Sequence, residues 1–81
     1  MNDLEWGSKI IKFIQTEMIK KNIPLEANEP LFSSGLIDSF DVVQLAVFLE
    51  EDHQIDIDET EMVFENFDTV EKIIEMIKRK K

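Results

Sequence analysis

The residues with the clearest chemical potential lie mid-chain, where Gly35-Leu-Ile-Asp38-Ser39-Phe40 precedes a strongly apolar stretch. A serine nucleophile needs a neighbouring base, and His53 is the one histidine in the chain. If Ser39 and His53 share one helix, a rise of about 1.5 Å per residue separates them by about 21 Å. A serine–histidine pair is therefore excluded unless that helix breaks, and we expect His53 to be a partly buried helix-end residue.

The same position suits a covalently attached anion. Asp38 is a good N-cap for a helix, with Asp41 in the first turn against the positive end of the dipole. Free backbone N–H groups at such a start favour an anion, such as a phosphodiester on Ser39. Gly35 permits backbone conformations that a Cβ atom would exclude just before the site. Serine alone is a common helix-start residue, so the surrounding pattern must decide.

The charge of the chain limits its partners. There are 18 acidic and 9 basic residues, for a net charge of −9. Fourteen of the acids lie between Asn22 and Glu71, a stretch without Lys or Arg. Surfaces that neutralise phosphates are basic, so we expect no nucleic acid partner and favour a cationic one. An EF-hand starting at Asp56 would have Glu61 where Gly is needed and Phe67 where Glu is needed, so we predict no metal site.

Composition also sets the class of protein. The chain has no cysteine, which excludes disulfides and thiolate metal sites. Its longest apolar run, Leu45–Leu49, is far shorter than the ~20 residues that cross a bilayer, so we predict no transmembrane segment. The N-terminus lacks the basic and apolar regions of a signal peptide. We expect one small cytoplasmic domain over residues 1–81.

The first part of the chain predicts a helix followed by a long loop. Two Gly and two Pro favour long regular elements and disfavour an all-β fold. The first helix should end near Asn22, because Pro24 disfavours helix at the residue before it. Its apolar face consists of Leu4, Trp6, Ile10, Ile11, Phe13, Ile14 and Met18. Apolar residues should pin the connection from Ile23 to Asp38 to the core, namely Leu25, Leu31, Phe32, Leu36 and Ile37.

A second helix should begin at Asp38 or Ser39 and end near His53. Its predicted core stripe is Val42, Val43, Leu45, Ala46, Phe48 and Leu49. Its predicted outward face is Phe40, Asp41, Gln44, Val47 and Glu51.

Two further helices complete the prediction. A short third helix is expected over 60–65, and a fourth should begin at Asp68 or Thr69 with basic residues 78–81 at its negative dipole end. The apolar stripe of the fourth helix is Val70, Ile73, Ile74 and Ile77. The sequence therefore predicts an all-α four-helix bundle with a long first loop and a short third helix.

The stretch from Pro30 to Leu45 resembles the attachment region of acyl carrier proteins and peptidyl carrier domains. In that region a Gly, two spacer residues and Asp-Ser precede a hydrophobic residue, usually Leu, at the start of the second helix. The segments Leu49–Ile57 and Glu65–Val70 look like the acidic end of that helix and the start of the last one. The resemblance covers most of the chain, and its ordered pattern is far more specific than Asp-Ser alone.

The resemblance implies a carrier that is not itself an enzyme. A phosphopantetheinyl transferase would move 4′-phosphopantetheine from coenzyme A onto Ser39, with Gly35 and Asp38 in the attachment site. The thiol of the arm would hold an acyl or aminoacyl group as a thioester. A chain without cysteine has no thiol of its own, so thioester chemistry on it needs the thiol of an attached group. An adenylating or other loading enzyme would supply this cargo, and downstream acyl- or aminoacyl-transferring enzymes would receive it. We expect a freestanding monomer.

Partner enzymes would contact the outward face of the second helix, formed by Phe40, Asp41, Gln44, Val47 and Glu51. Acids on this face predict salt-sensitive association with basic patches. Ser39-Phe40 in place of Ser-Leu is seen in some D-alanyl and other aminoacyl carriers, so an amino acid cargo ranks above a fatty acyl group.

Some alternatives stay open at the level of sequence. A set of apolar residues could line a site for the cargo or belong to the core, namely Met62, Val63, Phe64 and Phe67. From other functional classes, the alternatives are an unmodified acidic interaction module with the same fold and an acidic mimic of nucleic acid.

Overall fold

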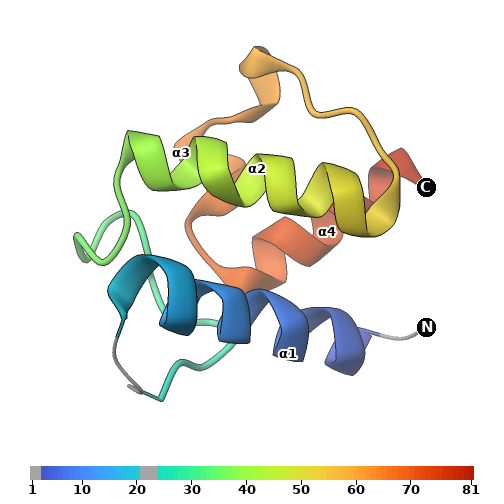
Figure 1. Ribbon diagram of the computed structural model, residues 1–81. Coiled ribbons are helices and arrows are strands. Elements are labelled where there is room, and N and C mark those ends of the chain that lie inside the picture. Colours follow the sequence, from blue (N-terminus) through green and yellow to red (C-terminus); the bar gives the residue numbers. More distant parts are fainter. Residues whose placement is uncertain (1–2, 21–23) are drawn as a thin grey trace.

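The computed structural model describes residues 3–20 and 24–81, and every regular element in this part is helical (Figure 1). The longer elements are α1 (Asp3–Phe13), its π-helical continuation η1 (Ile14–Ile19), α2 (Ser39–His53) and α4 (Val70–Lys80). The shorter ones are η2 (Glu59–Glu61) and α3 (Phe64–Phe67). The all-α fold with a long first loop is confirmed.

The helices are arranged so that the start of α2 lies apart from the ends of the chain. In Figure 1, α1 and α2 run side by side, and α4 passes behind them. The start of α1 and the end of α4 lie at one side of the view, where Lys81 Nζ is 5.5 Å from the centre of the Trp6 ring. The start of α2 and the loop before it lie at the opposite side. The functional segment is therefore remote from both ends of the described chain.

One apolar core holds the helices together. Its fully buried large side chains are Ile10, Ile14, Leu31, Leu45, Leu49, Phe67, Ile73, Met76 and Ile77. The stripe predicted for the last helix is buried, and the long loop is pinned by buried Leu25, Leu31 and Ile37. Phe32 and Leu36 are half-buried against the same core. The loop is thus a packed part of the fold, as predicted.

The predicted short third helix is present as α3, but its predicted bounds, 60–65, are wrong. The chain is extended at Val63 (φ −123°, ψ 161°), which divides this region into η2 and α3. The predicted end of the first helix near Asn22 lies outside the described residues. Within them, helical structure ends at Ile19, and Lys20 has a left-handed backbone (φ 58°).

The predicted core stripe of α2 contains one error. Val42, Leu45, Ala46 and Leu49 are buried, but the side chain of Val43 is 49% exposed. Val43 lies three residues after Phe40 and four before Val47, so helical periodicity places it with the outward residues. Phe48 is half-buried and stacks on Phe13, with ring centres 4.3 Å apart.

His53 closes α2 as a buried residue, 6% exposed, with its ring edge-on to Trp6 at 5.0 Å. Gln54 follows with a left-handed backbone (φ 55°), and its N–H donates to the carbonyl of Glu50. Because α2 is continuous from Ser39 to His53, the two cannot form a nucleophile–base pair. Burial lowers the pKa of His53, and although Asp52 opposes this, nearby lysines add to it.

The lowered pKa of His53 predicts a pH-dependent stability. The folded chain binds a proton on His53 less tightly than the unfolded chain, so protonation favours unfolding. The free energy of unfolding should therefore fall as the pH drops from about 7.5 to 5.5, through the ordinary histidine pKa. His53→Phe keeps an aromatic ring and should remove most of this change. Urea unfolding at several pH values measures it, and parallel pH profiles for the two proteins would contradict the assignment.

Candidate functional site

The start of α2 is fixed by two reciprocal hydrogen bonds. Asp38 has an extended backbone, and its carboxylate accepts a hydrogen bond from the Asp41 N–H at 3.1 Å. The Asp41 carboxylate in turn accepts from the Asp38 N–H at 3.0 Å. This capping box makes Ser39 the first residue of the helix. The predicted N-cap is thereby confirmed.

Ser39 is exposed in the first turn of α2. The first N–H groups of a helix have no partner within it, so an anion on the Ser39 oxygen would meet the positive end of the dipole. Gly35 has a left-handed backbone (φ 83°), and a Cβ built there would meet nothing within 4 Å. The space beside Gly35 is therefore open. The exposed hydroxyl of Ser39 at the start of a helix fits a long phosphate-linked arm.

Asp68 connects the loop before α2 to the junction between α3 and α4. This role of Asp68 is not among the sequence-based predictions. Its buried carboxylate accepts hydrogen bonds from the Phe32 and Ser33 N–H groups, both at 3.0 Å, and from the Ser33 hydroxyl at 2.8 Å. Burial opposes its charge, but these hydrogen bonds and nearby Lys72 outweigh burial and hold the pKa of Asp68 below its ordinary value. No local signal reveals a contact over 35 residues.

The structure places most of the predicted partner-facing residues on one exposed face of α2. Phe40 is 84% exposed and Val47 is 47% exposed, and Val43 lies between them. Gln44 and Glu51 are also exposed. Asp41 differs, because it is half-buried and its carboxylate is engaged in the capping box. The exposed apolar stripe therefore comprises Phe40, Val43 and Val47.

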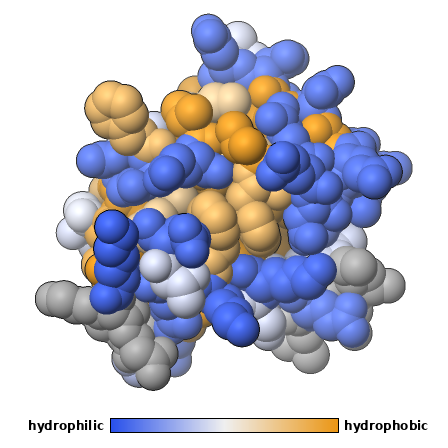
Figure 2. Space-filling view, in the orientation of Figure 1, coloured by the Kyte–Doolittle hydropathy of each residue, from blue (hydrophilic) through white to orange (hydrophobic). Residues whose placement is uncertain are grey.

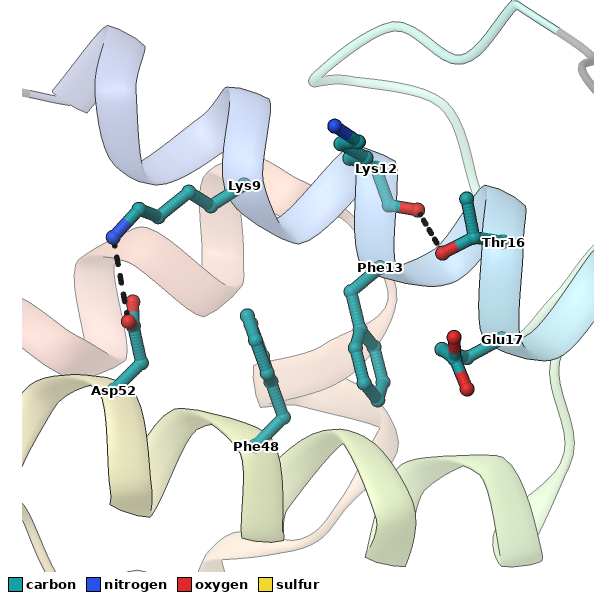
Figure 3. Close-up of a pocket in the computed structure, with 7 residues that line it drawn as sticks. All are labelled: Lys9, Lys12, Phe13, Thr16, Glu17, Phe48 and Asp52. Atoms are coloured by element: carbon teal, nitrogen blue, oxygen red, sulfur yellow. Dashed lines mark hydrogen bonds and ion pairs between the residues drawn. The ribbon is translucent and has the colours of Figure 1, made fainter.

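A groove of about 460 Å³ lies between α2 and the α1–η1 helix. Two of its lining residues, Phe13 and Phe48, also border a hollow beside Val43 and Val47, so the groove adjoins the apolar stripe. Phe13 and Phe48 point toward each other in the groove, and the ion pair of Lys9 with Asp52, at 3.3 Å, spans one end (Figure 3). Figure 2 shows the same region as an apolar area bordered by hydrophilic side chains. Ser39 does not line this groove.

The four apolar residues considered for the cargo do not share one environment. Phe67 is fully buried in the core, whereas Val63 and Phe64 are exposed and Met62 is half-buried. The Phe64 ring lies edge-on to Phe32, with centres 6.1 Å apart. The core interpretation therefore holds for Phe67 and in part for Met62, which packs against the core.

Two other classes of site find no support in the described part of the chain. Residues 3–20 and 24–81 contain no group of three or more His, Asp or Glu side chains placed to hold a metal ion. None of the helices described is long and apolar enough to cross a membrane.

Comparison with known proteins agrees with this geometry. Residues 9–77 match the model of the phosphopantetheine attachment site family. A search of the curated proteins finds no match. The matched region contains the loop, the capped start of α2 and Asp68, and it covers most of the chain. The chain therefore belongs to the phosphopantetheine attachment site family, whose domain carries covalently bound 4′-phosphopantetheine.

Proposed function

We propose that this chain is a carrier that holds an acyl or aminoacyl group as a thioester on a 4′-phosphopantetheine arm attached to Ser39. The observation that carries the proposal is an exposed serine, directly after a capping aspartate, at the start of α2 in a chain of this family. The absence of cysteine adds to it, because the chain has no thiol of its own.

In this proposal the chain presents the cargo and partner enzymes supply the chemistry. The arm, when attached, supplies the thiol that forms the thioester. Asp38 and Asp41 hold the first turn of α2, so that the Ser39 oxygen projects into solvent. A flexible arm raises the effective concentration of the cargo at each successive enzyme. The chain needs no acid or base of its own for this role, and His53 lies at the far end of α2.

The proposed partners are a phosphopantetheinyl transferase, a loading enzyme and an enzyme that receives the cargo. The exposed stripe of Phe40, Val43 and Val47 would supply apolar contacts beside the arm. Glu51 on the same face would attract cationic groups. Phe40 directly after Ser39 favours an aminoacyl over a fatty acyl cargo, by resemblance to aminoacyl carriers.

Substitution of Ser39 tests the attachment. With coenzyme A and a broad-specificity phosphopantetheinyl transferase, the wild-type chain should gain the mass of one arm, and Ser39→Ala should gain none. Ser34→Ala is the matched control, since it removes a nearby hydroxyl, and it should still be modified. Ser39→Ala should change the free energy of unfolding by less than about 1 kcal/mol, because the side chain is exposed. A wild-type chain that gains no mass would favour the unmodified interaction module.

Charge reversal at Glu51 tests the electrostatic part of partner binding. Glu51→Lys should lower kcat/KM for arm transfer roughly threefold at low salt, because encounter with a cationic surface slows. Glu75→Lys changes the net charge equally on α4 and is the control. The wild-type rate should fall with added salt, since screening acts over about 8 Å at physiological ionic strength. Equal effects of the two substitutions would contradict a role for this face.

Phe40 should contribute to recognition and not to folding. Phe40→Ala should change the free energy of unfolding by less than about 1 kcal/mol, because the ring is 84% exposed. The buried control Phe67→Ala should cost about 3–5 kcal/mol. Loss of an exposed aromatic anchor should lower kcat/KM for arm transfer about tenfold. Urea unfolding and transfer kinetics measure both effects, and an unchanged transfer rate would refute the recognition role.

A further inference from the structure

Asp68 makes contacts that the start of α4 does not require. The N-cap of α4 is Thr69, whose hydroxyl oxygen accepts a hydrogen bond from the Lys72 N–H at 3.1 Å. The Asp68 carboxylate is directed instead to the loop, where it is bonded by the backbone of Phe32 and by the backbone and side chain of Ser33. Asp68 is 7% exposed, so its carboxylate is buried against the loop.

A short series of hydrogen bonds connects Asp68 to the attachment site. The Leu31 N–H donates to the Asp68 carbonyl at 2.6 Å, and the Ile37 N–H donates to the Leu31 carbonyl at 3.2 Å. Ile37 is buried, and the next two residues are Asp38 and Ser39. Leu31 directly precedes Phe32 and Ser33, which the carboxylate holds, and it is hydrogen-bonded to the residue that precedes the helix cap.

The loop has little else that could replace this carboxylate. Residues 31–37 contain no titratable side chain, and they lie outside the regular helices. Buried or part-buried backbone N–H groups need partners, and here Phe32 and Ser33 find theirs on one side chain. The cap and the buried face of α2 do not involve Asp68, so α2 should form without it.

We propose that Asp68 is a positioning residue for the attachment of the arm: by holding residues 31–33, it sets the path of the chain into Ser39. This inference rests on the proposed function. The carboxylate touches neither Ser39 nor the arm, and it acts through the loop. Loss of the carboxylate should misplace the Ser39 oxygen for transfer while leaving the exposed face of α2 available for docking.

Asp68→Ala tests this proposal, because it removes the oxygen that accepts from Phe32 and Ser33, and Asp58→Ala is its matched control. Asp58 is the N-cap of η2 and not part of the attachment loop, and its N–H donates to the Glu61 carboxylate at 3.0 Å. With a broad-specificity transferase and coenzyme A, Asp68→Ala should lower kcat about tenfold and leave KM within about twofold, because only the reacting geometry changes. Asp58→Ala should keep wild-type values of both. A wild-type kcat for Asp68→Ala, or an equal loss for the control, would overturn the proposal.

Two further measurements keep the proposal testable if Asp68→Ala folds poorly or if arm transfer fails. Ser33→Ala removes only the hydroxyl contact with Asp68, and it should lower kcat by a smaller factor of about three. In unmodified protein, the backbone amide NMR signals of Ile37 and Ser39 should shift in Ser33→Ala and stay in place in Asp58→Ala. Unshifted signals in Ser33→Ala would overturn the positioning role. A wild-type chain that is never modified would instead refute the proposed function.

Discussion

Burial of one face of α2 is the constraint on which the rest of the molecule depends. Leu45, Ala46 and Leu49 are fully buried, and burying a leucine side chain stabilises the fold by about 1.5–3 kcal/mol. Rotating α2 to hide Phe40 would expose these side chains, so the helix has one stable orientation. That orientation leaves Ser39 and the apolar stripe of α2 in solvent. The exposure of a ring as large as Phe40 is therefore a consequence of how the core is packed.

The loop before α2 is held by polar contacts as much as by apolar ones. Leu31 and Ile37 anchor it in the core, and the Asp68 carboxylate accepts hydrogen bonds from the N–H groups of Phe32 and Ser33. A long irregular segment has few hydrogen bonds of its own, so a side chain from another element must supply partners. As a result, the attachment segment is connected to the junction of α3 and α4, although the two lie far apart in the sequence. The ends of the described chain lie away from this region.

Local signals in the sequence were sufficient for the parts of the fold that depend on neighbouring residues. Asp38 and Thr69 are helix caps, and the periodicity of α4 matches its buried stripe. The prediction that Val43 belongs to the core is wrong, because Val43 lies at the edge of the apolar face of α2. At that edge, a small rotation of the helix decides whether a side chain is buried or exposed. The contacts of Asp68 could not be predicted, because they join residues 35 and 36 positions apart. The predicted attachment of the arm at Ser39 remains a prediction.

Fragmentation mass spectrometry shows directly whether Ser39 alone bears the arm. The chain would be produced together with a phosphopantetheinyl transferase, digested, and sequenced by fragment ions across the peptide that contains Ser8 and across residues 30–48. Every fragment that contains Ser39 should carry the mass of 4′-phosphopantetheine, and fragments with only Ser8, Ser33 or Ser34 should be unmodified. An arm found on Ser33, Ser34 or Ser8, with Ser39 unmodified, would contradict the assignment of Ser39.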